Sequence, residues 1–69
     1  MSSIKIVING KDKEVDKNST IQDILDVLKV SSPMVVVEKN LEIISKTQYN
    51  NIVVEDADKL EIVGFFGGG

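Results

Sequence analysis

The chain has 69 residues and a net charge of −3, 42% of its residues are hydrophobic, and it contains no cysteine. A chain of this length forms one domain with room for one small core, which argues against an enzyme with a closed active site. The lack of cysteine excludes disulfides, thiolate metal sites and a cysteine nucleophile. Its eight basic residues are all lysines, and they form no stripe of the kind that nucleic-acid binding usually needs.

The sequence also shows no secretory signal and no apolar run close to the roughly 20 residues that span a bilayer. We therefore expect a cytoplasmic protein that binds neither nucleic acid nor membranes and that is a monomer when free. Its acidic charge is suited to an encounter with a basic patch on a partner enzyme.

A hairpin is the first predicted element. Isoleucines recur with a period of two along residues 4–8, which predicts a strand. Asn9-Gly10 follows, and this dipeptide favours a type I′ turn because both central residues of that turn need a positive φ. Residues 11–17 return as a second strand that is polar except for Val15, which indicates an edge strand.

A helix follows, with Thr20 as its N-cap and Asp23 three residues later, a pair that resembles a capping box. The next apolar residues repeat at i, i+3, i+4 and i+7, which places them on one face of a helix over residues 21–29. These are Ile21, Ile24, Leu25 and Leu28. Ser31-Ser32-Pro33 is expected to end the helix, because the residue before a proline is pushed out of the helical region.

The second half of the chain opens on an apolar run, Met34-Val35-Val36-Val37. An unbroken apolar run predicts a strand that is buried on both faces and is central in its sheet. Lys39-Asn40 predicts a turn, and residues 41–44 a short extended piece.

Shorter segments complete the pattern. Residues 45–51 are polar around Tyr49 and predict a loop or a single helical turn, with Tyr49 as a satellite of the core. Residues 52–54 are short and apolar, residues 55–58 predict a turn, and the last strand is expected from Leu60 to about Phe66.

This order of elements predicts an α+β fold. A single amphipathic helix has one apolar stripe, which it can bury across one face of a small mixed sheet, as in the β-grasp arrangement. We expect four to five strands with the main helix on one face. Residues 1–66 form this β-grasp domain, and residues 67–69 form a flexible tail.

The tail is the first candidate site. Gly67, Gly68 and Gly69 have no side chains, so their backbone can pass close to another surface. Three extended residues reach about 10 Å, enough to thread a narrow channel and place the Gly69 carboxylate against a nucleotide. A frayed end or an engineered scar is the alternative interpretation.

Other candidates are the two aromatics before the tail and three acidic residues in the preceding turn. Phe65 and Phe66 point to opposite sides of an alternating strand, so one is expected in the core and the other toward a partner. Val63 and Gly64 are expected to add to this docking surface. The turn acids Glu55, Asp56 and Asp58 have the acid-x-acid spacing of calcium loops, but the other ligands of an EF-hand are missing, so a solvated turn is favoured.

Asp23 and Asp26 lie three residues apart on the predicted helix. They are interpreted as its polar face rather than as a catalytic pair. The chain has no histidine to act as a base.

Taken together, these segments resemble the ThiS family, the sulfur carriers of thiamin biosynthesis within the ubiquitin-like β-grasp superfamily. The resemblance covers essentially the whole chain, including its length and early hairpin. It is carried by the helix opening Thr20-Ile21-Gln22-Asp23-Ile24-Leu25, by Asn40, Ile43-Ile44 and Tyr49, by Asp56-Ala57-Asp58-Lys59-Leu60-Glu61-Ile62, and by the terminal Gly68-Gly69. Ala57 and Ser45 depart from the family pattern, which often has glycine and proline there.

The resemblance implies a carrier that other enzymes act on, with no catalytic residue, metal or bound cofactor of its own. A ThiF-like adenylating enzyme would use MgATP to convert the Gly69 carboxylate into an acyl-adenylate, and a persulfide from a sulfur donor would displace AMP. The resulting Gly69 thiocarboxylate would supply sulfur to a ThiG-like thiazole synthase.

Three alternatives share the fold. One is a MoaD-like carrier for molybdopterin synthesis. Another is a protein modifier in which Gly69 joins a target lysine. The third is a ubiquitin-like interaction module whose tail has no chemistry.

Overall fold

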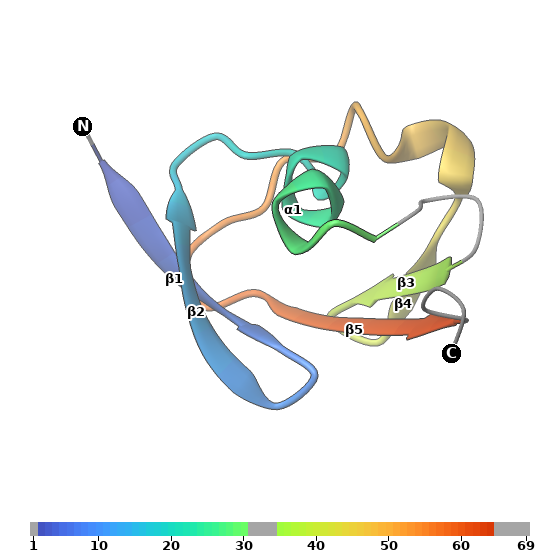
Figure 1. Ribbon diagram of the computed structural model, residues 1–69, viewed down its shortest axis with the longest axis horizontal. Coiled ribbons are helices and arrows are strands. Elements are labelled where there is room, and N and C mark those ends of the chain that lie inside the picture. Colours follow the sequence, from blue (N-terminus) through green and yellow to red (C-terminus); the bar gives the residue numbers. More distant parts are fainter. Residues whose placement is uncertain (1, 31–34, 65–69) are drawn as a thin grey trace.

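The computed structural model describes residues 2–30 and 35–64, which form a five-stranded mixed sheet and one main helix (Figure 1). In chain order the elements are β1 (Ser3–Ile8), β2 (Lys11–Asp16), α1 (Ile21–Leu28), β3 (Val35–Lys39), β4 (Glu42–Ile44), the 3-10 helix η2 (Lys46–Gln48) and β5 (Lys59–Gly64). The strand order is β2-β1-β5-β3-β4, and only β1 and β5 pair in parallel. The predicted α+β architecture is confirmed.

The first hairpin forms as its sequence predicts. Asn9 and Gly10 have φ values of 50° and 84°, as a type I′ turn requires. β2 is an edge strand, and Val15 is its one buried residue.

Both ends of α1 are capped. The Thr20 hydroxyl accepts the Asp23 N–H at 3.1 Å, and the Asp23 carboxylate accepts the Thr20 N–H at 3.0 Å, so the predicted capping box is confirmed. At the other end Lys29 has a φ of 60°, and the Lys29 and Val30 N–H groups donate to the carbonyls of Asp26 and Leu25. This Schellman motif ends α1 before residues 31–34, which lie outside the described residues. None of the described helices is long and apolar enough to cross a membrane.

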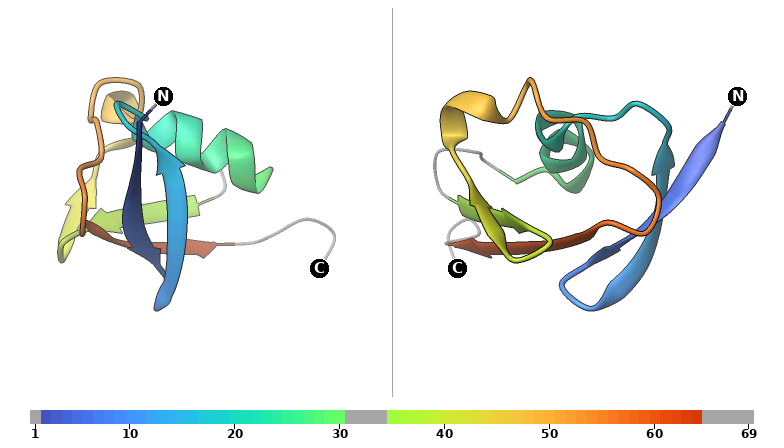
Figure 2. Two further views of the ribbon diagram at one scale, coloured as in Figure 1. Left: turned by 90° about the vertical axis from the view of Figure 1, so that its left-hand side faces the viewer. Right: turned by 180° about the vertical axis from the view of Figure 1, so that it is seen from behind.

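The core lies between α1 and the face of the sheet that α1 covers (Figure 2). Tyr49 is 2% exposed and is a full member of this core rather than a satellite of it. The buried hydrophobic residues are Ile6, Val15, Ile21, Ile24, Leu25, Val35, Val37, Tyr49, Val54, Leu60 and Ile62.

β3 differs from its prediction. It is an internal strand between β5 and β4, but it is buried on one face only. Val35 and Val37 face the core, whereas Val36 is 46% exposed. The reason is that α1 covers one face of the sheet and no described element covers the other, which we call the open face. Met34 lies outside the described residues.

The remaining segments are mainly turns. The β3–β4 turn is formed by Asn40 and Leu41, with φ values of 52° and 74°, one residue later than predicted. The segment around Tyr49 contains η2, in agreement with the predicted helical turn. Residues 52–54 form only an isolated bridge between Val53 and Thr20. The predicted turn at 55–58 is closed by a hydrogen bond from the Asp58 N–H to the Glu55 carbonyl.

Candidate functional site

The end of β5 is the part of the described structure nearest to the predicted tail. In the pairing of β3 with β5, Val35 lies opposite Gly64 and Val36 opposite Val63. We call these four residues the tail base. Val63 is 64% exposed and lies on the open face beside Val36, so the structure places the predicted docking residues Val63 and Gly64 at an accessible strand end. Phe65, Phe66, Gly67, Gly68 and Gly69 lie outside the described residues.

The tail base is held from the side by η2 and the residue that follows it. The Lys46 ammonium donates to the Val35 carbonyl at 3.0 Å, and the Tyr49 hydroxyl donates to the same oxygen at 3.4 Å. Burial raises the pKa of Tyr49 above its usual value, so the phenol stays protonated at neutral pH and remains a donor. These contacts fix the first residue of β3, which lies opposite Gly64 at the end of β5.

Exposed aliphatic residues extend the tail base along the open face. Ile43 is 71% exposed and lies opposite Glu38, and Leu41 is 90% exposed in the adjoining β3–β4 turn. No site role was predicted for Val36, Ile43 or Leu41. The alternation of side chains along a strand could have indicated two of them, because it places Val36 and Ile43 on the solvent side of a sheet that is covered on one face only.

Acidic side chains on the open face have no ion-pair partner among the described residues. Glu38 lies directly opposite Glu61 across β3 and β5. Like charges in this position are destabilising. Within residues 2–30 and 35–64 the one ion pair is Lys39 with Asp58, at 3.6 Å.

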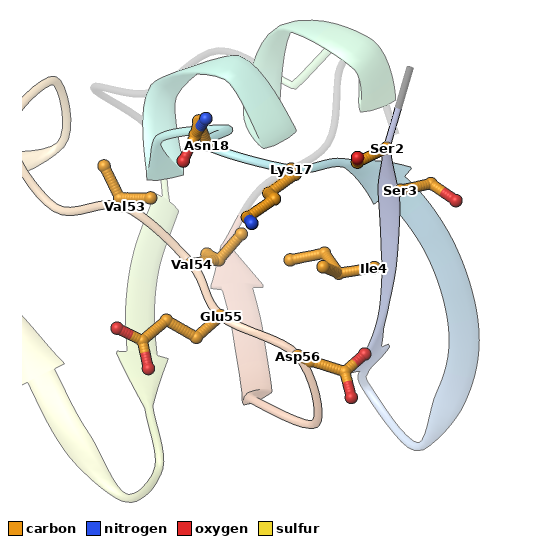
Figure 3. A pocket seen from close by; sticks show the side chains of 9 residues that line it. All are labelled: Ser2, Ser3, Ile4, Lys17, Asn18, Val53, Val54, Glu55 and Asp56. Carbon is orange, nitrogen blue, oxygen red and sulfur yellow. The ribbon is translucent and has the colours of Figure 1, made fainter.

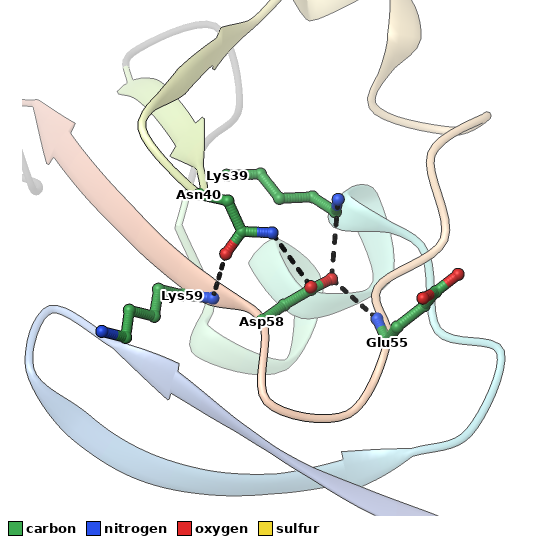
Figure 4. Close-up of polar contacts among 5 residues, drawn as sticks. All are labelled: Lys39, Asn40, Glu55, Asp58 and Lys59. Carbon is green, nitrogen blue, oxygen red and sulfur yellow. Dashed lines mark hydrogen bonds and ion pairs between the residues drawn. The ribbon is translucent and has the colours of Figure 1, made fainter.

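The acidic side chains of the turn before β5 form hydrogen bonds that stabilise the fold. Asp58 is 9% exposed, and its carboxylate accepts the Glu55 N–H at 2.8 Å and the Asn40 side-chain amide at 3.1 Å (Figure 4). Asp56 accepts the backbone N–H of Lys5 at 2.9 Å. The described residues contain no group of three or more acidic residues that could hold a metal ion.

The two helix carboxylates have equally local partners. Asp23 belongs to the capping box, and Asp26 accepts a hydrogen bond from the Gln22 side chain at 2.9 Å. Neither is placed to act with the other on a substrate.

A surface groove lies between the start of β1, the loop after β2 and the segment before β5 (Figure 3). Its lining residues are Ser2, Ser3, Ile4, Lys17, Asn18, Val53, Val54, Glu55 and Asp56. The parallel register pairs Val7 with Lys59, which places the start of β1 at the opposite end of the sheet from Gly64. The groove is therefore separate from the tail base.

Comparisons with known proteins identify the family and the fold of this chain. The model of the ThiS family matches residues 6–69. The chain belongs to the ThiS family. It is 44% identical over 63 residues to a sulfur carrier protein ThiS of Bacillus subtilis (strain 168), covering 90% of this chain and 96% of that protein. A crystal structure of a ThiS protein from Geobacter metallireducens superimposes with a TM-score of 0.81 at 32% identity, covering 96% of this chain and all of that one. The ThiS likeness confirms the predicted β-grasp fold.

A second kind of relative is much longer than this ThiS-family chain. The chain is 47% identical over 66 residues to a thiazole synthase of Paramagnetospirillum magneticum, which covers 96% of this chain but only 20% of that protein. The chain thus spans about a fifth of the length of this relative. A segment similar to this chain is therefore part of a larger polypeptide that is named for a synthase.

Proposed function

We propose that this chain is a sulfur carrier of thiamin biosynthesis, a protein that other enzymes act on rather than a catalyst. The observation that carries the proposal is its 44% identity to a protein named as a sulfur carrier, over nearly the full length of both chains. The small size of the domain is compatible with a substrate role.

The sulfur in this proposal is carried by the Gly69 carboxylate. A ThiF-like enzyme binds MgATP, and a carboxylate oxygen attacks the α-phosphate, which gives an acyl-adenylate and releases pyrophosphate. The terminal sulfur of a persulfide then attacks the acyl carbon and displaces AMP, which gives an acyl disulfide. A second thiol cleaves the S–S bond, leaving a thiocarboxylate on Gly69 and a disulfide on the donor side.

Every sulfur in this cycle comes from outside the chain. The sequence has no cysteine, so the persulfide and the reducing thiol both belong to partners. The side-chain-free residues Gly67 and Gly68 let the backbone enter a narrow active site, while the tail base and Phe65 or Phe66 supply the docking surface. ATP and magnesium are held by the activating enzyme.

Thiazole synthase is the proposed acceptor of the sulfur. Support comes from the relative in which a segment 47% identical to this chain belongs to a polypeptide named thiazole synthase. Two functions joined in one polypeptide indicate that the separate proteins act on each other.

Intact mass tests the proposal. The chain is incubated with MgATP, its activating enzyme and a persulfide donor, with a variant lacking Gly69 as the control. We expect the mass increase for one oxygen replaced by sulfur, and we expect none in the control. Adducts on lysines of other proteins would instead indicate a modifier, and an unchanged mass would leave only an interaction module.

A further inference from the structure

Leu41 combines two features that a folded protein normally avoids. Its side chain is 90% exposed, and its φ of 74° lies in the left-handed region. A positive φ is uncommon outside glycine and asparagine, and for a bulky residue it is strained. The preceding Asn40 has a φ of 52° and suits the turn, so the hairpin sequence favours glycine at the next position.

No contact within the described fold explains this leucine. A side chain that is 90% exposed packs against almost nothing, and Leu41 is not among the residues packed on the core. The turn itself is closed by neighbouring residues, because Lys39 pairs with Glu42 and the Asn40 N–H donates to the Lys59 carbonyl at 2.8 Å. A strained and exposed leucine that has no contact inside the protein indicates a contact with another molecule.

The surroundings of Leu41 define the chemistry of that external contact. Ile43, two residues on, is 71% exposed and gives Leu41 an apolar neighbour. Two carboxylates share the open face with Ile43, because Glu38 lies opposite Ile43 on one side and opposite Glu61 on the other. A complementary surface would therefore offer an apolar pocket with lysine or arginine at its rim.

The position of Leu41 suits a second point of attachment. The β3–β4 turn lies at the Lys59 end of β5, whereas the tail leaves from the Gly64 end. Five strand steps separate the two ends, a distance of about 17 Å. A partner that holds only the tail leaves the domain free to pivot, whereas a contact at the far end of β5 fixes its orientation.

We propose that Leu41, supported by Ile43, is an anchor that enters an apolar pocket with a basic rim on thiazole synthase. The partner is chosen because a segment similar to this chain occurs in one polypeptide with a thiazole synthase. The inference rests on the proposed function for its partner. It goes beyond that function by assigning a recognition role to one residue at the end of the sheet opposite the tail.

Binding of the unmodified full chain to its purified thiazole synthase tests the anchor, by titration at low and high salt. Leu41→Gly removes the side chain and relieves the positive φ, so we expect affinity to fall at least about tenfold while Tm rises by about 2–6 °C. Leu41→Met keeps an apolar side chain of similar volume and should bind almost as tightly as the native chain. Native binding should weaken with salt, because the proposed rim contacts are ionic.

Val27→Ser is the matched control, since Val27 is an exposed aliphatic residue on α1 with 63% exposure. The anchor would be overturned if Leu41→Gly bound as tightly as the native chain. It would also be overturned if Val27→Ser or Leu41→Met lost as much affinity as Leu41→Gly. A fall in Tm for Leu41→Gly would overturn it as well, because the strain argument would then be wrong.

Thiocarboxylate formation separates this inference from the proposed function. Leu41→Gly should be converted by the activating enzyme as fast as the native chain, and a selective loss at that step would overturn the assignment to thiazole synthase. A native chain that is never converted would refute the carrier function. Synthase binding would still report on Leu41, because the titration uses the unmodified chain.

Discussion

The side chain of Asn9 completes the pairing between β1 and β5 by bonding both backbone groups of Ile62. Its amide oxygen accepts the Ile62 N–H at 2.7 Å, and its amide nitrogen donates to the Ile62 carbonyl at 3.1 Å. The direct backbone register between these strands covers only Val7 with Lys59 and Ile8 with Leu60. The primary amide thus acts as a peptide group that extends the ladder by one step, and it ties the first hairpin to the strand that leads to the tail.

Asn9→Gly should lower the free energy of unfolding by about 1–2.5 kcal/mol, because two hydrogen bonds are lost while the turn keeps a residue that tolerates positive φ. Urea denaturation measures the change. Asn18→Gly is the control, since Asn18 also has a positive φ, of 72°, and no side-chain hydrogen bond links it to the described part of the chain. Similar values for the two variants would show that the Asn9 bonds contribute little.

A second prediction concerns Asp58, which joins three segments through its carboxylate (Figure 4). Asp58→Ala removes two hydrogen bonds and the ion pair with Lys39 at a site that is 9% exposed, and we expect a loss of about 1–3 kcal/mol in unfolding free energy. Lys39→Met removes only the ion pair at 3.6 Å, whose side chains keep some contact with water, and should cost about 0–1 kcal/mol. Equal losses in the two variants would mean that the ion pair, and not the hydrogen bonds, dominates.

Local patterns predicted the elements of this fold well. The alternation in β1, the Asn9-Gly10 turn and the capping box of α1 depend on neighbours within a few residues, so they are legible in the sequence alone. Burial of β3 was predicted less well. An apolar run such as Val35-Val36-Val37 has the same letters whether one face of its sheet is covered or both, and only the tertiary arrangement shows that Val36 is exposed.

The candidate site was predicted in part. The tail residues were proposed from composition and family resemblance and lie outside the described residues, so that part stays a prediction. Val63 was proposed from its position before them, and it is exposed at the end of β5. The position of Ile43 on the open face could be recognised only from the β3–β4 register, and the strain at Leu41 only from its backbone φ angle. The paired bonds of Asn9 connect residues 53 positions apart, which no local pattern encodes.

A third prediction concerns the backbone conformation of Ala57. This residue is exposed and has a φ of 73°, a conformation that glycine adopts without steric cost. Ala57→Gly should therefore raise the unfolding free energy by about 0.5–1 kcal/mol. Val27→Gly introduces the same residue inside α1, where glycine is less favourable than valine, and should lower stability by about 0.5 kcal/mol. A loss of stability in Ala57→Gly would contradict the strain assigned to this turn.

The fourth prediction concerns alkaline stability and the buried phenol of Tyr49. Burial raises the pKa of Tyr49 in the folded chain above its unfolded value of 10.0, so the folded state favours the protonated phenol. The unfolded chain releases its proton first as the pH rises. The stability that depends on this proton is therefore fully present below pH 10 and is lost as the pH climbs through the folded-state pKa.

Tyr49→Phe isolates this effect from the lysines, which titrate in the same pH range. At pH 7 the variant should lose about 1 kcal/mol, because the hydrogen bond to the Val35 carbonyl is removed. Above pH 10 the native chain should lose stability faster than the variant, so the difference between their urea midpoints should shrink. Parallel pH profiles for the two proteins would show that Tyr49 ionises as easily in the folded chain as in the unfolded one.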